Sequence, residues 1–172
     1  EKVWYDTSNI TRGSGYFDQT FIYPIWSDSE PEDDESYSVW MQENGVDKNI
    51  NNNLTAIKSN IQTMNLAWPA YDPNNQRQDL DRWMDLYRVE PDFIQSGPMT
   101  MVVNGKEYAN SENVSSDPPY TFYGTDSVEP TLKIDTREQR RQLNLTFESN
   151  VVGGNFTMGQ ILMVARLGDV RA

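Results

Sequence analysis

Apolar and polar residues alternate along most of this 172-residue chain, and glycine and proline interrupt the alternation at intervals. A period of two places successive side chains on opposite faces of a strand, whereas a helix repeats every 3.6 residues. In the clearest example, Leu143–Phe147, the apolar residues Leu143, Leu145 and Phe147 would share one buried face. The pattern therefore predicts an all-β fold, an antiparallel β-sandwich or jelly-roll-like domain with long polar loops and little helix.

The same reasoning predicts several further strands. Leu132 and Ile134 alternate in the same way, and Ile161–Ala165 is a continuous apolar run, which is typical of a central strand covered on both faces. Shorter segments with strand-like composition are Phe21–Trp26, Val39–Met41, about Ala56–Met64, and Tyr120–Tyr123. Pro24 favours an edge or a bulge for the first of these, because proline cannot donate a ladder hydrogen bond.

Two segments carry stronger local signals. The dipeptide Asn104-Gly105 lies between Met99–Val103 and Lys106–Tyr108. Because it favours a type I′ turn, a hairpin is predicted there.

The segment Asp79–Val89 is ambiguous, because it fits both a short amphipathic helix and a strand. We favour the strand because aromatic and branched residues are prominent. Pro91 is expected to end either element.

The length suits one sizeable core. We expect residues 1–44 to hold N-terminal strands and an acidic loop, residues 45–172 to form the β-sandwich domain, and the whole chain to make one compact unit. The sequence begins at Glu1 without a basic and then apolar leader, which suggests a processed product or a piece of a longer polypeptide. No apolar run approaches the roughly 20 residues that a membrane span requires.

Composition narrows the function classes. The chain has no cysteine and no histidine, which excludes thiol nucleophiles, Cys-ligated metal sites and the Ser-His-Asp triad. A hydrolase using two carboxylates needs neither residue type, but 26 acidic residues would supply such a pair by chance. We therefore expect no enzyme activity and no cofactor. The formal net charge of −12 also disfavours tight binding of nucleic acid or of anionic membranes.

One loop, Ser27–Ser38, concentrates negative charge. Its carboxylates are Asp28, Glu30, Glu32, Asp33, Asp34 and Glu35. Calcium takes six to eight oxygen ligands, but the run lacks the spacing and the bidentate glutamate of an EF-hand loop. We interpret it as a solvated acidic surface and expect no metal site, because runs of like charge are usually exposed.

The tryptophans are candidates for binding surfaces. Four of them are predicted to anchor subunit interfaces: Trp26, Trp40, Trp68 and Trp83. The same four and Trp4 are also candidates for a carbohydrate-binding face.

Three arginines gather near the start of a predicted strand: Arg137, Arg140 and Arg141. We expect them to pair with carboxylates during folding or assembly, because the guanidinium fork binds carboxylates in a bidentate manner.

The second half of the chain carries a longer pattern. It runs through Ile134–Gln142 into Leu143–Asn150, continues at Gly153–Gly159 and closes with Leu167–Arg171. It resembles the C-terminal part of bacteriophage tail structural proteins, the nozzle or tail-tube proteins of short-tailed phages, which tend to show D-x-R-x-x-G-R-Q, then R-F-E-S-N, an apolar strand and G-D-x-R. Arg140 stands where that pattern usually has glycine.

The resemblance extends upstream to about Gly45. Thr55–Leu66 and Trp83–Asp92 are similar to a pair of strands in the same family that ends in a Val/Ile-x-Pro-Asp-Phe run, here Val89–Phe93. It implies a virion component that assembles as a ring, commonly sixfold, with other tail proteins, and through which DNA passes without being held. The alternative left open is a carbohydrate- or receptor-binding β-sandwich module at a tail tip or cell surface.

Overall fold

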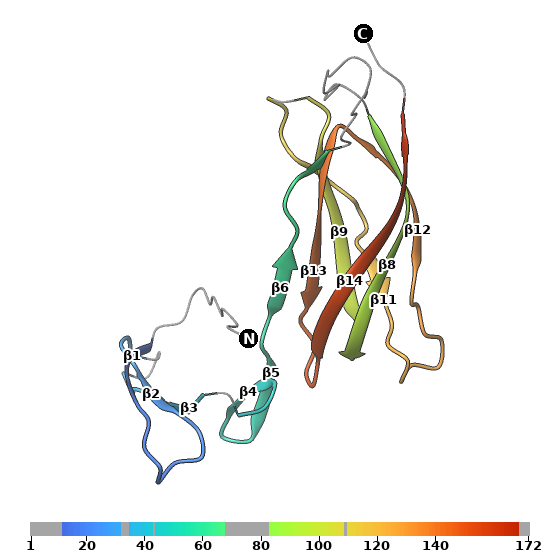
Figure 1. Cartoon of the computed structure of the whole chain (residues 1–172). Helices are drawn as coiled ribbons and strands as arrows, with labels where there is room; N and C mark the ends of the chain where they lie inside the picture. The colour runs from blue at the N-terminus through green and yellow to red at the C-terminus, as the bar shows by residue number, and fades with distance from the viewer. Residues whose placement is uncertain (1–11, 32–34, 43, 68–82, 109, 169–172) are drawn as a thin grey trace. The chain divides into compact units, whose positions relative to one another are not determined.

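The computed structural model describes residues 12–31, 35–42, 44–67, 83–108 and 110–168. These residues contain fourteen strands and no helix (Figure 1). The chain divides into two compact units, Glu1–Gly45 and Val46–Ala172. The sequence predicts one compact unit, with a boundary inside it between residues 44 and 45.

The first unit contains a three-stranded antiparallel sheet in the order β1-β2-β3. Its strands are β1 (Arg12–Tyr16), β2 (Ile25–Asp28) and β3 (Val39–Met41). Trp26 on β2 lies opposite Trp40 on β3 and opposite Gly15 on β1. A Cβ atom at Gly15 would lie 2.6 Å from the Trp26 ring, so the glycine leaves the space that this ring occupies.

The second unit contains two larger sheets and a hairpin. The hairpin pairs β4 (Asp47–Ile50) with β5 (Asn53–Ala56). The first large sheet has the path β10-β9-β13-β6, with β11 also paired to β9 and β7 to β13. Its strands are β6 (Ser59–Gln62), β7 (Leu66–Ala67), β9 (Met99–Lys106), β10 (Val114–Ser115), β11 (Tyr120–Phe122) and β13 (Gln142–Ser149).

The second large sheet has three antiparallel strands in the order β12-β8-β14. They are β8 (Met84–Ser96), β12 (Ile134–Arg140) and β14 (Asn155–Leu167). The connections β8–β9, β12–β13 and β13–β14 are short, and each passes from one large sheet to the other (Figure 1). At the β8–β9 connection Gly97 has a φ of 75°, which residues with a Cβ rarely adopt. The predicted all-β, sandwich-like fold is confirmed.

The core lies between the two large sheets. Alternate residues of β9 and β13 are fully buried, as a period of two requires: Met99, Met101, Val103, Leu143, Leu145 and Phe147. Leu86 and Val89 of β8 belong to the same cluster. The Phe93 ring meets the Phe147 ring edge-on, with centroids 5.3 Å apart, and also meets Phe122 and Phe156. Such edge-to-face pairs add to the free energy gained by burial.

The predicted Asn104-Gly105 hairpin is wrong. The strand β9 runs through both residues, and Gly105 lies opposite Val114 of β10 and Leu143 of β13. Pairing on both sides outweighs the local turn preference of the dipeptide. The glycine has a different role, because a Cβ here would lie 2.5 Å from Cγ of Arg140 and 2.7 Å from the Gln142 carbonyl oxygen. It permits a close approach of neighbouring backbone.

Three other predictions also need correction. Ile161–Ala165 is not a central strand, because β14 lies at the edge of its sheet within the described residues. Pro91 does not end β8; it lies opposite Ile161 beside a bulge in the β8–β14 ladder, a position that tolerates proline. Leu132 does not share the buried face of Ile134, because it precedes β12 and is exposed.

The remaining strand predictions agree to different degrees. Val39–Met41 coincides with β3, and Tyr120–Tyr123 contains β11. The strand interpretation of Asp79–Val89 is confirmed from Met84 onward, whereas residues 79–82 lie outside the described residues. Only parts of Ala56–Met64 form strands, namely β6 and, at Ala56, the end of β5. Phe21–Trp26 is wrong for most of its length, because β2 begins after Pro24.

Candidate assembly surface

The edge strand β14 combines length with exposed apolar side chains. Ile161 and Ala165 pack against the core, so residues 162, 164 and 166 point to the opposite face of the sheet. Leu162 is 54% exposed, Met163 40% and Val164 50%. Long apolar edge strands offer unpaired backbone groups to another chain. The exposed edge of β14 is therefore the strongest candidate for an assembly surface.

Two other sheet edges differ from β14 in length or charge. The strand β6, at one end of the first large sheet, has only four residues. The strand β12, at the opposite edge from β14, carries Asp135, Arg137, Glu138 and Arg140. Short length and charged residues are devices that protect sheet edges from unwanted pairing. The middle of β14, from Ile161 to Ala165, has no charge and no proline.

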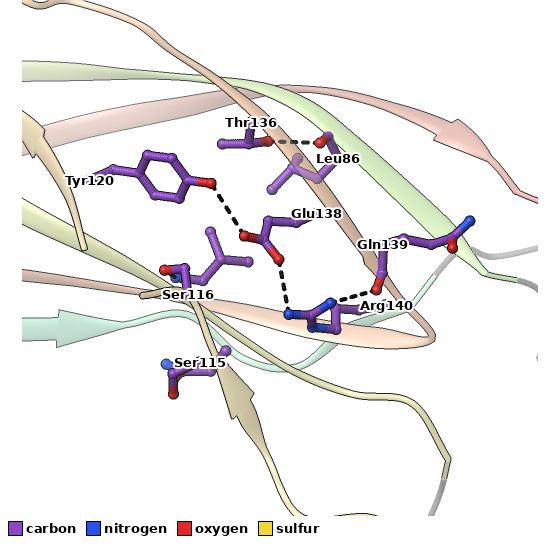
Figure 2. Close-up of polar contacts among 10 residues, drawn as sticks. Leu86, Ser115, Ser116, Tyr120, Thr136, Glu138, Gln139 and Arg140 are labelled. Atoms are coloured by element: carbon purple, nitrogen blue, oxygen red, sulfur yellow. Dashed lines mark hydrogen bonds and ion pairs between the residues drawn. The ribbon is translucent and has the colours of Figure 1, made fainter. Parts of the chain in front are cut away.

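A chain of polar contacts surrounds Arg140, one of the three arginines selected from the sequence (Figure 2). Arg140 Nη2 lies 2.9 Å from Oε2 of Glu138, and the Tyr120 hydroxyl donates to Oε1 of the same carboxylate at 3.2 Å. Arg140 Nη1 also donates to the Gln139 carbonyl oxygen at 2.8 Å. Partial burial, reinforced by the negative charge of Glu138, raises the pKa of Tyr120. These contacts link β11 to β12.

The other two arginines have different surroundings. Arg137 is exposed on β12. The Arg141 guanidinium lies over the Tyr108 ring, 5.6 Å from its centroid, in a cation–π arrangement. The structure therefore does not bring the three arginines together at one site.

An ion pair that the sequence analysis missed crosses from β8 to β12. Arg88 Nε donates to Oδ1 of Asp135 at 2.6 Å, and Arg88 Nη1 lies 3.6 Å from Oε1 of Glu90. The hydrogen bond from Arg88 holds the pKa of Asp135 below its usual value. The two partners are 47 residues apart, and they lie opposite each other in the strand register. No local sequence signal links them.

We expect removal of the Arg88 guanidinium to raise the pKa of Asp135 toward its ordinary value. The folded-state pKa of Asp135 is depressed, so the contact stabilises the fold above the unfolded-state pKa, about 3.9. This contribution is lost as the pH falls through the folded-state value. A carbon-detected NMR titration of Asp135 in Arg88→Gln and in the parent chain measures the shift.

Arg166→Gln provides the matched control, because it removes a guanidinium that lies over the Tyr87 ring. Its substitution should leave the titration of Asp135 unchanged. Equal pKa values for Asp135 in the parent and in Arg88→Gln would contradict the described ion pair.

The outer face of the first large sheet carries a ladder of uncharged polar side chains. Asn104 Nδ2 donates to Asn144 Oδ1 at 3.2 Å and to Thr146 Oγ1 at 3.1 Å. Gln62 Nε2 donates to the same Asn144 oxygen at 2.9 Å, and the Ser115 hydroxyl donates to Asn104 Oδ1. The ladder joins β10, β9, β13 and β6. Its amide groups hydrogen-bond one another across these strands.

The tryptophans occupy different positions. Trp83 is 6% exposed, and its ring meets Tyr108 edge-on. Trp26 is 38% exposed and Trp40 is half-buried, both in the first unit. Trp4 and Trp68 lie outside the described residues.

The acidic loop is described only in part. Asp28 belongs to β2, where its Oδ2 accepts a hydrogen bond of 2.7 Å from Trp40 Nε1. Glu30 and Glu35 are exposed, whereas Glu32, Asp33 and Asp34 lie outside the described residues. Among the residues described, no group of three or more acidic side chains is placed to hold a metal ion.

The described residues contain no helix that is long and apolar enough to cross a membrane.

The sequence matches no protein-family description and no curated protein.

Proposed function

We propose that the chain is a non-enzymatic structural subunit of a bacteriophage virion tail, a ring component of the nozzle or tail tube that works through contacts between subunits. The exposed apolar edge of β14 carries this proposal. A long, uncharged strand edge is suited to pairing with another chain. The resemblance of Asp135–Arg171 to tail proteins supplies the setting, a virion in which this subunit contacts other copies and further tail proteins.

The charge of the chain agrees with a place along a DNA conduit. A net charge of −12 repels phosphate groups, so DNA would pass such a subunit without being held. Exposed acidic residues contribute to this charge in both units, for example Glu30 and Glu35 in the first and Asp135 in the second.

Weaker support exists for the alternative function, a carbohydrate- or receptor-binding module. Sugar-binding sheet faces use exposed aromatic rings for stacking, and Trp26 is an exposed tryptophan of the first unit. In the second unit, Trp83 is buried, and the polar ladder of the first large sheet consists of Asn, Gln, Ser and Thr side chains.

The assembly part of the proposal predicts that the purified chain associates. Light scattering coupled to gel filtration measures its mass at micromolar and at near-millimolar concentrations. We expect particles heavier than the 19.8 kDa chain, and the proportion of these particles should rise with concentration. A mass of one chain at every concentration would contradict the proposal.

A further inference from the structure

We propose that β14 pairs in an antiparallel manner with β14 of a second copy of this chain, about a two-fold axis at Met163. This inference rests on the proposed assembly role, because it names the strand, the partner and the register of one subunit contact. Among the described strands β14 pairs with β8 alone, so its other edge pairs with no described strand. Antiparallel pairing of two identical edges satisfies backbone groups on both copies.

The net charge of the chain favours a second copy of the chain as the partner of the β14 edge. Two chains that each carry −12 repel each other over most of their surfaces, so close approach requires a region free of acidic residues. Arg166 is the only charged residue between Glu148 and Asp169. The strand β14 lies in this segment. The acidic residues next to it in the structure, Glu90 opposite Leu162 and Asp92 beside Gly159, belong to β8 and so lie on the side of β14 away from a paired second copy. A basic partner would instead be drawn to the acidic surfaces elsewhere.

The sequence of the strand selects the register. With Met163 opposite its own copy, Leu162 lies opposite Val164 of the second chain, and Ile161 lies opposite Ala165. The apolar residues of the two strands then coincide. The same register places Arg166 opposite Gln160, so the two arginines lie at opposite ends of the paired segment. Like charges directly opposite each other would destabilise the ladder, and this register avoids them.

The ladder between β8 and β14 has two irregularities, between Met158 and Ile161 and between Val164 and Ala165. The residues from Ile161 to Val164, which include the proposed two-fold axis at Met163, pair with β8 in an unbroken register. An isologous contact of this kind closes after two copies. A ring would then be built from such pairs through a second contact.

A charge placed on the exposed strand tests the contact. Leu162→Lys should weaken dimerisation at least tenfold by sedimentation equilibrium, because it puts an ammonium group against Val164 of each partner. Leu162 is more than half exposed, so the substitution should leave the melting temperature of the chain nearly unchanged. Thr157→Lys is the control: it adds the same charge to an exposed position of the same strand, outside the paired segment.

Cysteine cross-linking tests the register, since the chain has no cysteine of its own. In Met163→Cys the two sulfur-bearing residues would face each other with Cα atoms about 4.5–5.5 Å apart, within the range of a disulfide. We expect a covalent dimer on mild oxidation of the full-length chain. In Leu167→Cys the two cysteines would be offset by about 26 Å along the strands, so this control should remain uncross-linked.

The outcomes separate this inference from the proposed function. Oligomers that withstand Leu162→Lys and give no Met163→Cys dimer would overturn the β14 pairing while the assembly role stands. A parent chain that stays monomeric at all concentrations would overturn both. Cross-linking at position 167 but not at position 163 would show a different register and would also overturn the inference.

Discussion

Phe147→Ala is expected to lower the free energy of unfolding of the second unit by about 3–5 kcal/mol, the usual cost of deleting a buried phenylalanine ring. Phe147 is fully buried on β13, and its ring contacts those of Phe93 and Phe122 between the two large sheets. The substitution removes these contacts and leaves a cavity in the core. Urea denaturation followed by tryptophan fluorescence measures the change, and the buried Trp83 is one reporter in this unit.

Ile94→Ala is the matched control. Ile94 lies next to Phe93 on β8 but is 78% exposed. Its truncation should change the free energy of unfolding by no more than about 0.5 kcal/mol. A loss of less than about 1 kcal/mol for Phe147→Ala would contradict the placement of this ring at the centre of the core.

Gly105→Val is expected to destabilise the second unit by about 2–3 kcal/mol or to prevent it from folding. A side chain at this position would strike the Gln142 carbonyl oxygen and the aliphatic part of Arg140. The first of these is backbone in the neighbouring strand β13, so it cannot move without disturbing the ladder. Urea denaturation and the dispersion of NMR amide signals together measure both outcomes.

The control for this variant is Thr100→Val on the same strand. Thr100 is half-buried on the outer face of the sheet, and valine has a high strand propensity, so we expect a change within about 0.5 kcal/mol. If Gly105→Val were as stable as the parent chain, β9 would not pass close to β13 at this point. Such a result would favour the turn that the sequence predicts at Asn104-Gly105.

Local alternation was sufficient to predict the parts of the fold that depend on it. Leu143, Leu145 and Phe147 were predicted to share a buried face, and all three are fully buried on β13. A period of two specifies which side of a strand is apolar, whatever the neighbours are. The all-β class follows from several such segments.

The errors arose where neighbouring strands decide the outcome. Asn104-Gly105 has the composition of a turn, but pairing of β9 with β10 and β13 keeps the backbone extended through it. The apolar run Ile161–Ala165 looks the same in a central strand and in an exposed edge strand. Only the strand order distinguishes the two, and strand order is a property of long-range pairing.

The candidate assembly surface shows the same difference between local sequence signals and long-range strand pairing. Sequence reasoning selected Arg140, which binds Glu138 two residues away, because a cluster of charges is visible in the sequence. It missed the Arg88–Asp135 pair, whose partners meet only through the register of β8 and β12. The tryptophans stay predicted interface residues. The exposed Leu162, Met163 and Val164 of β14 were not among the candidates, because an apolar run does not show which strand edge is free.

The location of the native chain decides whether it has the proposed role of a structural subunit of a phage tail. Antibodies raised against the Val46–Ala172 unit, conjugated to gold, can be applied to purified virus particles from the culture that produces the chain and viewed by electron microscopy. We expect gold on the tails, with several copies of the chain per particle by quantitative mass spectrometry. Unlabelled particles, with the chain recovered only as a free monomer, would contradict it.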